Sequence, residues 1–318
     1  MLRGLAALGV AAYHFTQIPP LFLHGQAFPV FWVGLRGVAV FFVLSGFVIL
    51  ATAYRVADRR AFVLARFWRL YPTFLVCMLL TTAFVFLFGL PKPRALDWVL
   101  NLTMFPGWFG ATYLDVPYWT LGFEIAFYAV VAVMLPAIKR GYALHLCAVY
   151  LGVSPFLPPF VAGCSVCFVL GVGLFEAQRS ENPLPGIGVM VAALLLSPEP
   201  LWASAELIGV AGAASIPLPD RLVPLARWVG AVSYPFYLLH CLIGCFFVVV
   251  IATLSGSISA GIAIALPLTI SVAVGVEWAE RLARRRNRAA REGRACGASP
   301  QLWSAGAPTT MMVSRSQR

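Results

Sequence analysis

The sequence contains little charge. Only 11% of its 318 residues are Asp, Glu, Lys or Arg, whereas 61% are hydrophobic and the mean hydropathy is +0.86. Soluble chains carry roughly 25% charged residues, so this composition excludes an ordinary soluble domain, a disordered chain and a collagen. The apolar runs are continuous rather than alternating with a period of two, which argues against a β-barrel. The sequence therefore predicts an all-α, polytopic membrane protein.

Metal-ligating residues are also scarce. Six of the seven cysteines lie in apolar runs, and the C-x-x-C formed by Cys164 and Cys167 is embedded in CSVCFVLGVG. A metal or redox site needs more ligands or an aqueous face than this motif offers. We therefore interpret these cysteines as structural and predict neither a metal site nor a disulfide framework.

Ten apolar segments approach the length of about 20 residues that crosses a bilayer. The expected spans are 4–22, 30–53, 70–90, 117–137, 142–157, 160–177, 184–198, 200–218, 227–251 and 259–280. One long loop, 91–116, is rich in aromatic and turn residues, and we expect it on the membrane surface. Residues 1–280 therefore form a transmembrane domain, and residues 281–318 form a basic, disordered cytoplasmic tail.

The basic residues predict the orientation of these spans. With the N-terminus inside, the outer loops contain only Lys92 and Arg94, and all other loop Lys and Arg residues are cytoplasmic. This distribution follows the positive-inside rule and places both termini in the cytoplasm. Residues 281–318 hold nine Arg and one Glu, a net charge of +8. Such a tail suits anionic lipid headgroups, and we expect no nucleic-acid partner.

Ionisable side chains inside the hydrocarbon are costly unless paired or hydrated, so each one marks a candidate site. Counting 1.5 Å per residue places His14 about 16 Å above the inner surface. The same count places Arg36, Glu124 and His240 about 10 Å below the outer surface. Four spans thus bring ionisable groups into one slab of the membrane, where Arg36 is a candidate counter-ion for Glu124. Arg3 shares a helix face with His14.

Each of these residues also has a structural interpretation. His14 could be a hydrogen-bonded packing residue, Arg36 could extend to the interface, and His240 could cap a polar pocket. Glu124 is harder to explain in this way, because a buried carboxylate needs a cation or a proton. His145 and Glu206 lie on the least certain spans and receive no functional assignment.

Further polar residues follow helical spacing around these positions. Thr120, Glu124 and Tyr128 repeat at every fourth residue, and Ser233, Tyr237 and His240 also share a face.

On the inner side, Arg66 and Arg69 form a pair one turn apart. Such a pair suits a phosphate-bearing ligand, although cytoplasmic anchoring explains it equally well. Ser45 and Gly46 in FFVLSGF allow close helix packing. Because G-x-S-x-G is absent, we expect Ser45 to serve packing or ligand contact rather than nucleophilic attack.

Several ordered blocks resemble the membrane acyltransferase 3 family. They are LRGLAALGVAAYH with Arg3 and His14, GVAVFFVLSGFVI, RFWRLYP, WTLGFEIAFY with Glu124, and VSYPFYLLH ending at His240. Glu277 is similar to the final Glu of the family, and the resemblance covers residues 2–281. The second block departs from the pattern, because Ala39 and its neighbour lack the usual acidic side chain.

The resemblance implies a membrane-bound O-acyltransferase of the bacterial inner membrane. Acyl-CoA, most simply acetyl-CoA, would be the co-substrate, with no bound cofactor. The acceptor would be a carbohydrate or glycolipid, such as exopolysaccharide or lipopolysaccharide, and the partners would include membrane lipid and polysaccharide-assembly proteins. The expected residues are His14, Glu124 and Arg3 for catalysis; Arg66, Arg69 and Ser45 for acyl-CoA; and Arg36, Trp119, Thr120, Tyr128, Ser233, Tyr237 and His240 for the acceptor or for support of the site.

Two other functions remain open from the sequence. Intramembrane charges also mark transport pathways, so a transporter or flippase for a lipid-linked sugar is the main alternative, although no inverted repeat is visible. The alanine at position 39 also allows a catalytically silent membrane assembly subunit. If the protein is an acyltransferase, His14 acts either as a general base or as a nucleophile that forms a covalent acyl-histidine intermediate.

Overall fold

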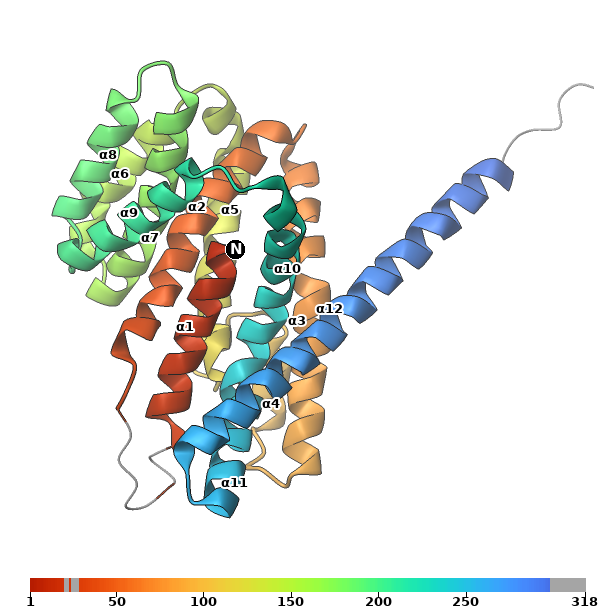
Figure 1. Cartoon of the computed structure of the whole chain (residues 1–318). Coiled ribbons are helices and arrows are strands. Elements are labelled where there is room, and N and C mark those ends of the chain that lie inside the picture. Colours follow the sequence, from red (N-terminus) through yellow and green to blue (C-terminus); the bar gives the residue numbers. More distant parts are fainter. Residues whose placement is uncertain (20–22, 24–28, 298–318) are drawn as a thin grey trace, which may run out of the picture. The chain divides into compact units, whose positions relative to one another are not determined.

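The computed structural model describes residues 1–19, 23 and 29–297, and among these residues it contains helices and no strand. The chain divides into two units, Met1–Trp278 and Ala279–Arg318. The helices, shown in Figure 1, are α1 (Leu2–Gln17), η2 (Trp32–Arg36), α2 (Gly37–Arg55), α3 (Arg59–Leu87), α4 (Ala95–Asn101), η3 (Pro106–Phe109), η4 (Val116–Tyr118), α5 (Trp119–Lys139), α6 (Ala143–Val153), η5 (Ser154–Phe156), α7 (Pro159–Arg179), α8 (Leu184–Leu195), α9 (Pro200–Ser215), η6 (Asp220–Leu222), α10 (Val223–Leu239), η7 (His240–Gly244), α11 (Cys245–Ser255) and α12 (Ile258–Gly297).

Six helical segments are long and apolar enough to cross a membrane. They are Trp32–Arg55, Arg59–Leu87, Val116–Lys139, Pro159–Arg179, Asp220–Ser255 and Ile258–Arg286. Their outward faces are apolar as well: Leu79 and Leu87 of α3 are 66% and 78% exposed. Helices whose buried and exposed faces are both apolar use the bilayer as their solvent. The protein is therefore a multi-pass helical membrane protein.

The other four expected spans are also helical but shorter. They correspond to α1, α6, α8 and α9, none of which exceeds 16 residues. The number of crossings and their orientation therefore remain predictions.

Two sequence-based boundaries differ from the structure. Helix α3 begins at Arg59 rather than near 70, because the Asp58 carboxylate accepts a hydrogen bond from Ala61 N at 2.8 Å and caps the helix there. Arg66 and Arg69 are consequently helical residues. The basic segment expected to be disordered from residue 281 instead begins as helix, since α12 extends to Gly297. The remainder of that expected tail, 298–318, lies outside the described residues.

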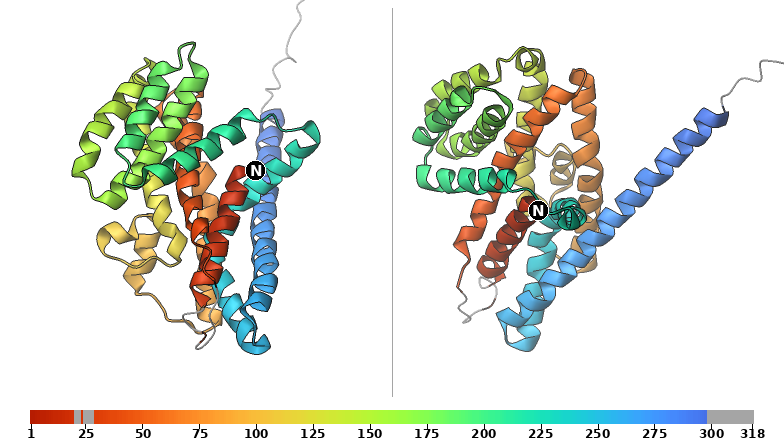
Figure 2. Two further views of the ribbon diagram at one scale, coloured as in Figure 1. Left: turned by 60° about the vertical axis from the view of Figure 1, so that its left-hand side comes forward. Right: turned by 45° about the horizontal axis from the view of Figure 1, so that its top comes forward.

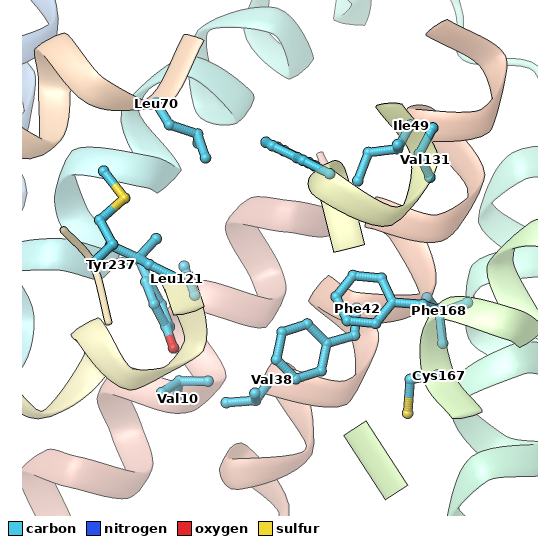
Figure 3. Close-up of a cluster of buried hydrophobic side chains, with 14 of the residues drawn as sticks. Val10, Val38, Phe42, Ile49, Leu70, Leu121, Val131, Cys167, Phe168 and Tyr237 are labelled. Atoms are coloured by element: carbon cyan, nitrogen blue, oxygen red, sulfur yellow. The ribbon is translucent and has the colours of Figure 1, made fainter. Parts of the chain in front are cut away.

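The first unit is built around α2. Helices α6, α7, α8 and α9 pack on one another and join the remaining helices mainly through the contact of α7 with α2. Helix α1 lies between α2 and α10 (Figures 1 and 2). The shared core is aromatic and aliphatic, and the Phe42 and Phe168 rings stack at 4.8 Å between centroids (Figure 3).

Close packing of α2 on α7 depends on Gly46. A Cβ atom at this position would lie 2.2 Å from the Phe168 carbonyl oxygen, which is far inside van der Waals contact. The sequence-based expectation that Ser45-Gly46 permits close helix approach is therefore confirmed.

Gly46→Ala should destabilise the protein, because the added methyl must push α2 away from α7. Overpacking of this kind costs about 1–3 kcal/mol. Gly188→Ala in α8 is the matched control, since a Cβ there meets no atom within 4 Å; this change should be neutral or stabilising by about 0.5–1 kcal/mol. Thermal unfolding in detergent measures both variants, and equal midpoints would contradict the close contact.

Candidate functional site

A pair of histidines lies in the core of the first unit. Nδ1 of His14 on α1 and Nε2 of His240, where α10 meets η7, are 2.8 Å apart, and the two rings are nearly parallel, at 16°. His240 is completely buried, whereas His14 keeps 8% of its surface exposed. His14 is therefore the less buried member of the pair. The two histidines are 226 residues apart in the chain, and the sequence placed both in one slab of the membrane.

The hydrogen bonds of this pair fix the position of each proton. Nδ1 of His240 lies 2.8 Å from the Tyr237 carbonyl oxygen, which can only accept, so this nitrogen carries a proton and donates it. Nε2 of a neutral His240 is then an acceptor, and Nδ1–H of His14 donates to it. Nε2 of His14 keeps its lone pair. The arrangement thus leaves one basic nitrogen on the less buried ring.

An unusual turn presents His240 to His14. Residues 240–244 form a π-helical turn. Such turns are rare in proteins, and those that occur are often found at functional sites. The Asp115 carboxylate accepts the Leu242 backbone N–H with both oxygens, at 3.1 and 3.2 Å. Gly244 faces α1, where a Cβ atom would lie 2.6 Å from the Phe15 ring. The turn is therefore held by Asp115 on one side and packed tightly beside His14 on the other.

The loop before α5 positions Asp115. The Asn101 side chain donates to the Thr112 carbonyl at 2.8 Å and accepts from Leu114 N at 3.1 Å, while Asp97 accepts from Thr112 N at 3.3 Å. Asn101 and Asp97 are both buried. These residues of 91–116 are thus packed inside the protein, and the position of the loop on the membrane surface stays a prediction. Their polar types in an aromatic-rich loop were the available signal, and the sequence interpretation missed it.

Burial also changes the acidity of Asp115, which precedes the membrane-spanning segment of η4 and α5. The side chain is 2% exposed, and loss of solvation raises its pKa to about 7, although the Leu242 N–H opposes the shift. The carboxyl group therefore titrates in the neutral range while it supports the turn that carries His240.

Polar residues of α5 and α10 extend this region. The hydroxyl groups of Thr120 and Tyr237 lie 3.2 Å apart and connect the two helices, and Figure 3 shows the Tyr237 ring inside the core. Ser233 instead donates to the Gly230 carbonyl of its own helix. Trp119 packs against Phe42 and Phe123. The structure thus joins Thr120 and Tyr237 to His240, whereas Ser233 is occupied locally.

A second polar group gathers three arginines and one glutamate, which we call the arginine cluster: Arg3, Arg66, Arg69 and Glu124. Arg3 donates to the Ser45 hydroxyl at 3.5 Å, and Glu124 accepts from the Tyr128 hydroxyl at 2.5 Å. Arg69 lies within electrostatic range of both Arg3 and Glu124. With three cations and one carboxylate, the cluster has an excess positive charge of two, which suits an anionic ligand.

Arg66 is the buried member of this cluster. Its guanidinium donates to the Thr52 hydroxyl at 2.5 Å and lies 5.6 Å from the centre of the Tyr128 ring, while its Nε has no partner among the described residues. A cavity of about 250 Å³ opens beside Arg66 and Tyr128 and is otherwise lined by apolar side chains such as Leu70 and Ile125. The site thus combines a guanidinium N–H that lacks an acceptor in the described part of the chain with a largely apolar cavity wall.

The proposed pairing of Arg36 with Glu124 is wrong. Arg36 forms a two-pronged ion pair with Glu199, in which Nη2 donates to Oε1 at 3.0 Å, and its guanidinium stacks on Trp202 at 4.7 Å. Depth along the membrane normal placed Arg36 and Glu124 together, but the structure gives them different partners, since Glu124 accepts from Tyr128. The single slab of the sequence interpretation therefore separates into the histidine pair, the arginine cluster and a third group around Arg36.

Comparison with known proteins identifies the chain at the level of a family. The model of a family described as an acyltransferase domain matches residues 1–259. No curated protein and no solved structure matches the chain. The resemblance found in the sequence is therefore confirmed, while the roles of individual site residues remain predictions.

The pKa of Asp115 predicts how stability depends on pH. Its folded pKa of about 7 lies above the ordinary value of 3.8 for an aspartic acid, so the folded state holds the proton more tightly than the unfolded state. The stability that this proton contributes is lost as pH rises from about 4 to 7. Asp115→Asn keeps a carbonyl acceptor for the turn but does not titrate. The variant should lose part of the decline in unfolding midpoint over this range. Identical pH profiles for the variant and the parent protein would contradict the assignment.

Proposed function

Because this chain belongs to the acyltransferase 3 family, we propose that it transfers an acyl group, most simply acetyl, from cytoplasmic acyl-CoA to a hydroxyl of a cell-surface carbohydrate. The acceptor is an exopolysaccharide or its lipid-linked precursor, and the enzyme resides in the bacterial inner membrane. The observation that carries the proposal is the histidine pair, which leaves His14 with one free basic nitrogen.

His14 Nε2 acts as general base in this reaction. It takes the proton of the acceptor hydroxyl, whose oxygen then bonds to the thioester carbonyl carbon. As the carbon–sulfur bond breaks, the proton passes from His14 to the departing thiolate, which gives the ester and free CoA. The charge that His14 carries between these transfers is stabilised through its Nδ1–H, which donates to His240, and through the His240 bond to the Tyr237 carbonyl.

The arginine cluster binds the donor. Arg66 and Arg69 hold CoA phosphates, because guanidinium groups match phosphate oxygens in charge and geometry. The apolar cavity beside Arg66 accommodates part of the uncharged arm of the donor. Arg3 of this cluster contacts Ser45 and shares helix α1 with His14, so it links the donor side to the base. Glu124 and Tyr128 orient the arginines rather than the base, and Trp119 and Thr120 support the acceptor side.

His14→Ala should abolish glycan acylation while the protein still folds. Loss of a general base reduces the rate by about 10²–10⁴-fold. His145→Ala is the matched control, because His145 contacts only the Tyr142 ring among the interactions described, and it should retain the activity. Mass spectrometry of surface glycan, before and after mild base, measures the ester directly.

The same experiment separates the alternative functions. A transporter would lose export of the glycan itself when His14 is replaced, and a non-catalytic assembly subunit would tolerate the change with the ester intact. Either result would contradict the proposal.

Replacing Arg66 and Arg69 together with Gln should weaken donor binding. Each charge-assisted hydrogen bond contributes about 1.5–3 kcal/mol, so the KM for acyl-CoA should rise at least about tenfold while the acceptor KM changes little. Arg60→Gln serves as control, because Arg60 is exposed at the start of the same helix. An unchanged KM in the double variant, measured in proteoliposomes, would refute the donor-site assignment.

A further inference from the structure

A cavity of about 430 Å³ lies where α2, α5, α7 and α9 begin. Its volume falls in the range of small-molecule sites. The wall combines aromatic rings with several polar side chains, and its lining includes Phe42, Trp119, Phe160, Arg36, Glu199 and Glu206. Neither the arginine cluster nor the histidine pair contributes a residue to its lining.

One carboxyl oxygen of Glu206, a residue that lines this cavity, lacks a hydrogen-bond donor among the described residues. Its side chain is 6% exposed, and Oε1 has no hydrogen-bond partner among the described residues. Oε2 has only the Cys167 thiol, with sulfur 3.9 Å away. A buried carboxylate oxygen without a donor is costly, so this atom calls for a ligand that donates a hydrogen bond.

The nearby arginine does not supply that donor. Both prongs of Arg36 point to Glu199, so this pair is already balanced, and Arg36 acts on Glu206 only through space. When Glu206 is ionised, the three groups together leave one net negative charge. The cavity therefore favours neutral or cationic ligands and disfavours anionic ones.

The aromatic rings indicate the shape of such a ligand. Trp119 and Phe160 lie 5.2 Å apart between centroids, and Phe42 lies 6.4 Å from Trp119. Aromatic walls pack against the flat C–H face of a sugar ring and also attract an ammonium group. A carboxylate that accepts from hydroxyl or ammonium groups completes the pattern of a sugar site.

A short series of contacts connects this cavity with the histidine pair. Trp119 immediately precedes Thr120, whose hydroxyl contacts that of Tyr237, and the Tyr237 carbonyl accepts from His240. The cavity residue Trp119 is therefore linked through Thr120 and Tyr237 to the residues that hold the base.

We propose that this cavity is a subsite for a sugar residue of the acceptor that donates hydroxyl or ammonium protons to Glu206 and carries no acidic group. The inference rests on the proposed function, since it takes the acceptor to be a glycan. Glu206 selects against uronic acids by charge and contacts the sugar directly.

Binding of three methyl glycosides tests the subsite. The full-length protein in lipid nanodiscs is titrated with the methyl glycosides of glucosamine, glucose and glucuronic acid, and binding is followed by ligand-observed NMR. The glucosaminide and the glucoside should bind, and the glucuronide should bind at least tenfold more weakly than the glucosaminide. Glu206→Gln should reduce that ratio at least tenfold, whereas Glu181→Gln on an exposed loop should leave it unchanged.

The ratio is informative because partial misfolding lowers all three affinities together. Gly163→Leu provides a second variant: a Cβ there has room beside Pro198, so the larger side chain narrows the cavity and should weaken the glucoside and glucosaminide. An unchanged ratio in Glu206→Gln, or no binding of the glucoside and glucosaminide, would overturn the subsite.

Acetyl transfer is measured in parallel on the same preparations. Binding with the expected ratio but without transfer from acetyl-CoA would leave the subsite standing and reject the proposed function. Transfer with an unchanged ratio would reject the subsite alone.

Discussion

The hydrogen bond between His14 and His240 is the interaction on which the account depends. Ionisable groups within a membrane domain are tolerated when they satisfy one another, and two neutral imidazoles do so without adding net charge. The bond requires one particular tautomer of each ring, because the Tyr237 carbonyl takes the outer proton of His240. The Asp115 carboxylate and the close fit of Gly244 then hold the π-helical turn in place. A basic nitrogen on His14 is the consequence of this whole chain of contacts.

Around the pair, the charges of the described residues are separated in a way that suits two different substrates. The arginine cluster is positive and includes an unsatisfied guanidinium nitrogen on Arg66, which fits a phosphate-bearing donor. The cavity at Glu206 is lined by aromatic rings, two carboxyl groups and one guanidinium, which fits a neutral or amino sugar. Ala39 lines this same cavity. The family resemblance predicts an acidic residue at this position or beside it. Here the carboxyl groups of the cavity belong to Glu199 and Glu206, at the start of α9 and within it. In the proposed reaction the histidine pair serves both substrates, since the base takes a proton from the acceptor and gives it to the departing thiolate of the donor.

The sequence predicts the helices well and the lateral arrangement poorly. Within the described residues, all ten expected segments contain a helix, because long apolar runs have few other options in a bilayer. Residue counting also predicts depth, and it correctly grouped His14 with His240. Depth is only one coordinate, however. The lateral arrangement of the helices depends on close contacts such as that of Gly46 with Phe168. In the arrangement observed, Arg36 pairs with Glu199 rather than with Glu124. For the same reason Asp115 was missed and Glu206 received no functional assignment: their partners come from helices whose neighbours cannot be read from a single sequence.

Nitrogen-15 NMR of the histidine rings in lipid bilayers tests the central claim most directly. With ring-labelled histidine, and with His14→Ala and His240→Ala used for assignment, the account predicts a protonated Nδ1 and an unprotonated Nε2 on His14, and a coupling across the hydrogen bond from His14 Nδ1 to His240 Nε2. A proton on His14 Nε2, or no coupling between the two rings, would contradict it.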